Sequence, residues 1–182
     1  MFNDGISFYD SDSLSNMESS NYEIFRNTLD NLGIKSGIAQ ELNGPITSCQ
    51  SLIDSITPKD NDGHHLLIYC ENNEMKGYIK YCTPGSKNLY FYSKKGAVKE
   101  FSPYCLLDFY VLDTKQRSGI GIKLFKRMLQ ECSNSDDNYH GNGNPNPDYL
   151  GSDAGNWAYD RPSPKLLPFL KKHFNLNNPD LQ

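Results

Sequence analysis

The sequence lacks the features that mark membrane, metal-binding and disulfide-bonded proteins. No apolar run approaches the roughly 18 residues that a membrane helix needs. The N-terminus has no basic segment followed by an apolar one, so we expect no signal peptide. The four histidines show no HExxH spacing and the five cysteines include no CxxC pair, so we expect no bound metal and no disulfide framework. Unpaired cysteines fit a reducing cytoplasm.

An excess of positive charge is also missing. The chain has 18 Lys and Arg against 22 Asp and Glu, a formal net charge of −4. This balance gives no support for binding to nucleic acid or to a membrane surface. Aromatic residues, in contrast, make up 12% of the chain, which is rich for a disordered protein. With 182 residues, the chain can form one domain with its own core.

The first half of the chain is typical of a helix followed by strands. Residues 1–20 are mostly polar and lack periodicity, so we expect a disordered leader before a domain at 21–182. Apolar spacing predicts a helix at 22–32, with Gly33 as its stop. Three short segments separated by polar turns then predict an antiparallel meander; they are 65–70, 76–81 and 89–92.

The pattern changes after residue 104. The apolar run at 105–112 predicts a strand buried on both faces, and a strongly amphipathic helix begins near Ile120. Residues 133–156 are rich in Asn, Asp, Gly and Pro and predict a flexible insertion. A short strand at 157–160 completes a strand–helix–strand unit.

A last helix is expected after Ser163, which can cap it with Pro164 at its first position, while Pro168 should bend it. The sequence therefore predicts a single α/β domain with a mixed, mostly antiparallel sheet flanked by helices.

The segment Gln116-Arg117-Ser118-Gly119-Ile120-Gly121 lies between the buried strand and the amphipathic helix. Glycines let a ligand approach the backbone, and the free N–H groups of a helix start favour a pyrophosphate. The alternative is a glycine-rich helix start without a ligand. Local sequence also leaves Cys105 open as a small buried hydrophobe and Asp160 as a turn or capping carboxylate.

Three blocks together resemble the α-tubulin N-acetyltransferases of the GCN5-related acetyltransferase (GNAT) superfamily. The first is Pro45-Ile46-Thr47-Ser48. The second runs from Cys105-Leu-Leu-Asp-Phe-Tyr-Val to Gln116-Arg117-x-Gly119-x-Gly121. The third is Asp160-Arg161-Pro162-Ser163 with the helix that follows. The resemblance runs from about residue 22 to 176 with the blocks in family order, and the Asp-Arg-Pro-Ser block is its most specific part.

The resemblance implies a GNAT fold, acetyl-CoA as co-substrate and the lysine side chain of α-tubulin as acceptor. It places the family's catalytic residues on Gln40, Cys105 and Asp160. It places acetyl-CoA binding on two segments, whose residues are Phe109, Tyr110, Val111, Leu112, Asp113, Thr114, Lys115, Gln116, Arg117, Ser118, Gly119, Ile120, Gly121 and Ile122, and Ser163, Pro164, Lys165, Leu166, Leu167, Pro168, Phe169, Leu170, Lys171 and Lys172.

The chain departs from the family pattern in its long 133–156 segment, in Pro168 and in stopping before the family's final strand. Acetyl transfer needs a base, for which Asp160 is the first candidate and Cys105 the second. We expect direct transfer in a ternary complex rather than an acetyl-cysteine intermediate. Alternatives are another amine acceptor or a non-catalytic domain that binds acyl-CoA or a protein.

The resemblance also implies microtubules as partner, a cytoplasmic and cytoskeletal location that extends to cilia or axonemes, and a monomer. Because tubulin is acidic, we expect a local basic patch in the meander. Its candidates are Lys76, Lys80, Lys87, Lys94, Lys95 and Lys99.

Overall fold

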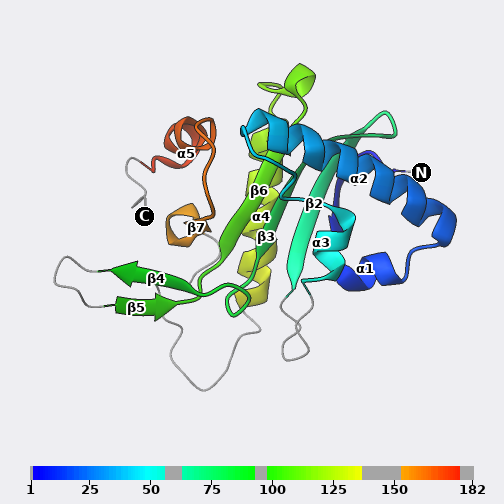
Figure 1. The fold of residues 1–182 in the computed structure, drawn as a ribbon. Helices are drawn as coiled ribbons and strands as arrows, with labels where there is room; N and C mark the ends of the chain where they lie inside the picture. The colour runs from blue at the N-terminus through cyan, green and yellow to red at the C-terminus, as the bar shows by residue number, and fades with distance from the viewer. Residues whose placement is uncertain (1, 56–62, 93–97, 137–152, 177–182) are drawn as a thin grey trace.

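The computed structural model describes residues 2–55, 63–92, 98–136 and 153–176, and Figure 1 shows how they are arranged. A five-stranded sheet of order β1-β2-β3-β6-β7 forms the centre. Helices α1, α2 and α3 pack on one face of the sheet, and α4 and α5 pack on the other. The predicted mixed, mostly antiparallel α/β domain is confirmed.

The N-terminal segment is structured, which corrects the expected disordered leader. Strand β1 (Gly5–Tyr9) pairs antiparallel with β2 (His64–Glu71), so that Ile6 lies opposite Tyr69. Helix α1 (Ser11–Ser15) follows, capped by the side chain of Asp10, and buries Leu14 to 2% exposure. The partner of β1 lies about sixty residues downstream, so local periodicity gave no sign of this strand.

Helix α2 (Ser19–Ala39) is longer than predicted and contains Gly33 in its interior. A Cβ atom at Gly33 would lie 1.9 Å from the carbonyl oxygen of Thr47, and one at Gly37 would lie 2.8 Å from that of Gly44. These glycines therefore allow segment 44–47 to pack against the helix, and Gly33 is not a helix stop. Gln40 is the C-terminal cap of α2.

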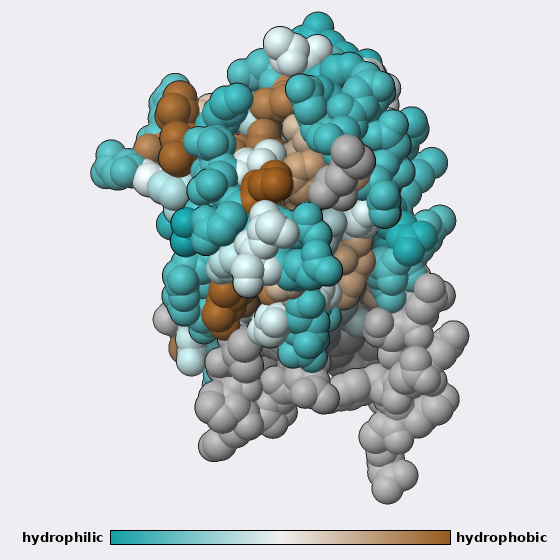
Figure 2. Space-filling model, turned by 90° about the vertical axis from the view of Figure 1, so that its right-hand side faces the viewer, coloured by the Kyte–Doolittle hydropathy of each residue, from teal (hydrophilic) through white to brown (hydrophobic). Residues whose placement is uncertain are grey.

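The other two helices on the same face of the sheet as α2 are short. Helix α3 (Cys49–Ile53) begins with a capping box between Ser48 and Ser51. The side of the molecule seen in Figure 2 is largely hydrophilic, with apolar groups in small separate places, which agrees with the polar composition of the chain.

Strand β3 (Glu74–Cys82) pairs with β2 and with β6 (Cys105–Val111), antiparallel to both. The predicted third strand of the meander does not join this sheet. Strand β4 (Leu89–Tyr92) instead pairs with β5 (Val98–Phe101) in a separate two-stranded sheet, visible beside the main sheet in Figure 1. The prediction of an antiparallel pairing for this region was right, but the partner was wrong.

The strand–helix–strand unit is as expected. After β6 come the 3-10 turn η1 (Asp113–Lys115) and helix α4 (Ile120–Asp136), and β7 (Ala158–Tyr159) then runs parallel to β6. The predicted apolar face of α4 is buried; it consists of Ile120, Leu124, Phe125, Met128, Leu129 and Cys132.

The boundaries of the predicted flexible insertion need correction. Residues 133–136 belong to α4, and Ala154 is buried in the 3-10 turn η3 (Ala154–Asn156). The first end extends a helix, and Ala154 at the other end contributes to the core. Residues 137–152 lie outside the described residues.

Helix α5 (Leu166–Phe174) begins two residues later than expected, with Lys165 in the cap position and no side-chain cap. The carbonyl oxygen of Ser163, not its side chain, accepts the Leu166 N–H at 2.9 Å. Pro168 lies in the first turn, where its missing N–H has no helical acceptor to lose. Within the described segments, no helix is long and apolar enough to cross a membrane.

Candidate active site

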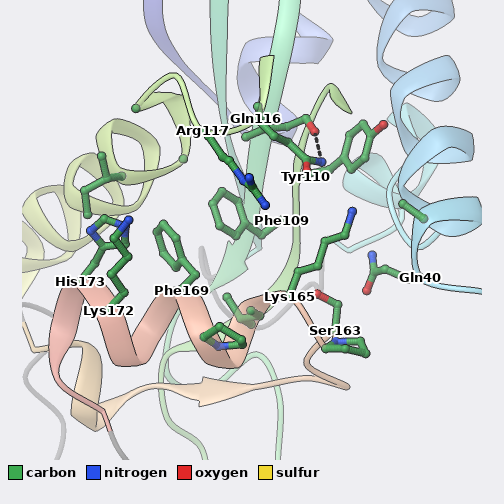
Figure 3. Close-up of a pocket in the computed structure, with 18 residues that line it drawn as sticks. Gln40, Phe109, Tyr110, Gln116, Arg117, Ser163, Lys165, Phe169, Lys172 and His173 are labelled. Atoms are coloured by element: carbon green, nitrogen blue, oxygen red, sulfur yellow. Dashed lines mark hydrogen bonds between the residues drawn. The ribbon is translucent and has the colours of Figure 1, made fainter. Parts of the chain in front are cut away.

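A cavity of about 950 Å³ opens between the end of α2, strand β6, the start of α4 and helix α5 (Figure 3). It brings together the two segments that the sequence predicted to bind acetyl-CoA. Fifteen of the predicted residues line it: Phe109, Tyr110, Val111, Gln116, Arg117, Gly119, Gly121, Ile122, Ser163, Pro164, Lys165, Leu166, Pro168, Phe169 and Lys172.

The other predicted residues do not line this cavity. Ile120 and Leu170 are core residues, 3% and 0% exposed. The remaining ones are Leu112, Asp113, Thr114, Lys115, Ser118, Leu167 and Lys171. A contiguous sequence block thus overstates the site, because alternate faces of a helix or strand point away from a cavity.

The loop before α4 has the backbone of an anion-binding turn. Arg117 and Gly119 both have positive φ angles, of 64° and 88°. The first hydrogen bond of the helix runs from Lys123 N–H to the Gly119 carbonyl oxygen, so the amides just before Lys123 have no acceptor within the helix. Such amides favour a negatively charged ligand.

Gln116 lines the cavity and also supports this loop. Its Nε2 donates to the Val111 carbonyl oxygen at 3.0 Å and to Asp113 Oδ1 at 2.7 Å. Cationic side chains complete the wall of the cavity: Figure 3 shows Arg117 and Lys165 extending into it, with Lys172 on α5. His173 also lines the cavity and was missed, although it lies four residues after Phe169 on the same helix.

Aromatic side chains form the floor of the cavity. The ring of Phe109 lies 5.4 Å from that of Phe169, and both contact Phe125 on α4. Gly121 fits closely here, since a Cβ atom would approach Phe109 Cζ to 3.2 Å. The cavity therefore joins an apolar floor to a cationic rim.

A small cleft adjoins the cavity and shares several residues with it. It is lined by Gln40, by Leu106 to Phe109 of β6 and by Asp160 to Ser163. A β-bulge lies at this point, because Asp108 pairs with Lys80 and Leu106 with Tyr81, which leaves Leu107 as the extra residue. The predicted residues Gln40 and Asp160 thus meet in one cleft.

Asp160 follows β7, and its backbone N–H donates to the Leu106 carbonyl oxygen at 2.9 Å. Its side chain is 20% exposed and forms an ion pair with Lys87 at 2.5 Å, while Arg161 Nε is 3.6 Å away. Lys87 was not predicted as a site residue. It comes from the segment between β3 and β4, and no local pattern connects it to Asp160.

Cys105 does not line either opening and is fully buried. It lies opposite Cys82 across β3 and β6, and both are free thiols. The hydrogen bond from Cys82 lowers the pKa of Cys105, against the effect of burial, and the same bond raises the pKa of Cys82. The sequence placed Cys105 at the ligand edge, but its neighbours Leu106 and Leu107 occupy that position.

Two lysines of the expected basic patch in the meander are buried rather than on the surface. Lys76 and Lys80 are 8% and 2% exposed, because β3 is a central strand. Lys80 donates to Ser51 Oγ at 2.9 Å, and burial lowers its pKa to about 8. Lys87 pairs with Asp160, and the side chains of Lys94, Lys95 and Lys99 lie outside the described part of the chain.

Known proteins share both the sequence and the fold. The family described as GNAT acetyltransferase, Mec-17, matches residues 1–139. An α-tubulin N-acetyltransferase of Tetrahymena thermophila is 38% identical over 81% of this chain and 30% of its own length. One of Phytophthora infestans is 37% identical over 76% of this chain and 65% of its own length.

A solved structure shows the same fold at much lower identity. It is an aminoglycoside acetyltransferase from a soil metagenomic sample in complex with sisomicin, with a TM-score of 0.52, 13% identity and coverage of 97% of this chain and 91% of that one. The chain spans less than two thirds of the length of these α-tubulin N-acetyltransferases. From the match over most of its length, the chain belongs to the Mec-17 family of GNAT acetyltransferases.

Proposed function

We propose that this chain binds acetyl-CoA in the large cavity and transfers the acetyl group to a lysine side chain of α-tubulin. The observation that carries the proposal is the junction of two openings. A cavity with an anion-binding loop and cationic rim adjoins a cleft that contains Gln40 and the carboxylate of Asp160. The names of the relatives supply the acceptor, and the family supplies the acyl-CoA donor.

The donor is held by the loop and by α5. The backbone amides from Gly119 onward bind the pyrophosphate at the start of α4, and Arg117 and Lys165 neutralise its charge. The apolar floor at Phe109 and Phe169 packs against the pantetheine arm. This arrangement directs the thioester toward the cleft beside the bulge at Leu107.

The acceptor needs a base. A lysine amine has a pKa of about 10.4, so about one molecule in a thousand is neutral near pH 7.4. Asp160 accepts a proton from the substrate ammonium. The neutral nitrogen attacks the thioester carbon, the C–N bond forms and the C–S bond breaks. The attacking nitrogen then loses its second proton, and the departing coenzyme A thiolate takes up this proton.

Cys105 is buried near the site and does not act as a nucleophile in this reaction. Its thiol is 0% exposed and packs with Cys82, Leu107 and Ala158, so an acyl carbon in the cavity does not reach it. Direct transfer in a ternary complex is therefore the mechanism we propose. Microtubules as partner, monomeric action and a cytoskeletal location that includes cilia or axonemes are part of the same proposal.

The test uses purified chain, acetyl-CoA, and tubulin or free lysine as acceptor, with mass spectrometry to locate the product. We expect acetyl-lysine on α-tubulin and little product from free lysine. Asp160→Asn should abolish most turnover while acetyl-CoA affinity, measured by calorimetry, is kept. Acetyl-CoA binding without transfer to any amine would contradict the proposal and favour a non-catalytic acyl-CoA domain. Transfer only to a small amine would mean that the acceptor is that amine and not α-tubulin.

A further inference from the structure

Asp108 is a buried carboxylate in the middle of β6, only 4% exposed, and the proposed chemistry does not use it. Its oxygens accept hydrogen bonds from side chains of several elements. The donors are Ser36 Oγ at 2.9 Å, Gln40 Nε2 at 3.1 Å, Thr47 Oγ1 at 2.6 Å and Tyr78 Oη at 2.6 Å. A carboxylate taken out of water needs such partners, and this one organises the junction of α2 with the sheet.

The network fixes which way the Gln40 amide faces. Gln40 Nε2 donates to Ser36 Oγ at 2.9 Å and to Asp108 Oδ1 at 3.1 Å. Because these two acceptors are themselves only 2.9 Å apart, they lie on the same side of Nε2, and the nitrogen of the amide, not its oxygen, faces them. The Ser36 hydroxyl donates to Asp108 and accepts from Gln40, so the hydrogen bonds run from Gln40 through Ser36 to Asp108.

The amide oxygen is then turned outward. No residue that the structure describes donates to Gln40 Oε1. Gln40 lines both the large cavity and the cleft, and Figure 3 shows the end of its side chain facing the same opening as Lys165 and Ser163.

We propose that Asp108, with Ser36, is a positioning residue that holds Gln40 Oε1 toward the cleft as an acceptor for an N–H of the substrate amine. A primary amine that attacks a carbonyl carbon must point its lone pair at that carbon. Acceptors for its N–H groups, Gln40 Oε1 beside Asp160, set that direction. This inference rests on the proposed acetyl transfer and on Gln40 taking part in it.

A purely structural role for Asp108 makes a different prediction. Loss of its bonds would then lower stability and leave turnover per folded molecule unchanged. Asp108→Asn separates the two cases, because the Asn oxygen suits the two hydroxyl donors, Thr47 and Tyr78. Its NH2 group would then face Gln40 Nε2, donor against donor, and the Gln40 amide would turn over.

The experiment is a mutant cycle with tubulin as acceptor. We expect Asp108→Asn to lower kcat by about tenfold or more while acetyl-CoA affinity is kept. In a Gln40→Ala background the same change should have almost no further effect on kcat. Ser36→Ala should lower kcat in the same direction and serves if Asp108→Asn folds poorly. Wild-type kcat in both variants, or effects that add fully to that of Gln40→Ala, would overturn the inference.

The control is Asp30→Asn, the same chemical change at a residue of α2, the helix that Gln40 caps. Asp30 Oδ1 accepts the Cys49 N–H at 2.7 Å and has no bond to Gln40, so this variant should lower stability without lowering kcat.

An NMR measurement is independent of turnover. The side-chain amide signal of Gln40, assigned by its loss in Gln40→Ala, should shift and exchange faster in Asp108→Asn. If the wild-type chain shows no transfer, or Gln40→Ala keeps full turnover, the proposed function of the site fails. An unchanged amide signal in Asp108→Asn would instead overturn the positioning.

Discussion

The ammonium of Lys87 lies 2.5 Å from Asp160 Oδ2, although the two residues are 73 positions apart. Asp160 is the proposed base, and the first ligand of its carboxylate is therefore a lysine of the protein itself. We therefore expect a substrate ammonium to compete with Lys87 for this carboxylate.

We expect Lys87→Met to lower the KM for tubulin, by up to about fivefold, since a partly exposed ion pair contributes up to about 1 kcal/mol. The kcat of Lys87→Met should stay close to that of the wild type, whereas Asp160→Asn should lose most of its kcat. Steady-state kinetics at low and moderate salt measure both values. A rise in KM would instead assign Lys87 to the binding of tubulin.

The loop before α4 gives a prediction on cofactor affinity. Gly119 has a φ angle of 88°, a conformation that a β-branched residue avoids, although space for a side chain is present. Gly119→Val should move the loop amides and weaken acetyl-CoA binding by about tenfold or more.

Isothermal titration with acetyl-CoA measures this change. Lys123→Ala is the control, because Lys123 lies just beyond the loop and its ammonium faces the ring of Tyr69. Equal affinities in the wild type and Gly119→Val would mean that the loop does not bind the phosphates.

His64 should make stability depend on pH. Burial, with the nearby charge of Lys80, lowers the pKa of His64 from 6.5 to about 4. The unfolded chain binds the proton more readily than the folded one. Neutral His64 therefore contributes fully to the stability of the fold above about pH 6.5, and this stabilisation is lost as the pH falls toward 4.

Between pH 7 and pH 5 we expect the free energy of unfolding to decrease by roughly 1 kcal/mol because of this residue, allowing for its partial exposure. His64→Asn should remove that part of the pH dependence in denaturant titrations. The same change at the exposed His173 should leave it in place. An identical pH dependence in His64→Asn would contradict the assignment.

The N-terminal segment should contribute to stability. Leu14 is 2% exposed and belongs to the core cluster that contains Phe25 and Leu29. Leu14→Ala should lower the free energy of unfolding by about 2–5 kcal/mol. Ile24→Ala, at a site that is 54% exposed, should cost less than about 0.5 kcal/mol. A loss in Leu14→Ala no larger than in Ile24→Ala would show that α1 is not part of the core in solution.

The sequence alone determined the second half of the fold and the outline of the site. The long apolar run at 105–112 and the amphipathic helix that follows are local patterns with periods set by backbone geometry. The glycine loop between them is also local. The family resemblance added Gln40 and Asp160, which the fold brings into one cleft.

Only the tertiary structure decided the features that depend on partners far away in the chain. Strand β1 forms by pairing with the edge of β2. Gly33 lies inside a helix, where its lack of a side chain lets segment 44–47 pack closely against it. Burial then decided which of the predicted residues lie at the cleft: it encloses Cys105, and it leaves Asp160 at the opening with Lys87. Periodicity reports the face on which a side chain lies, whereas the contacts it makes depend on which elements pack together.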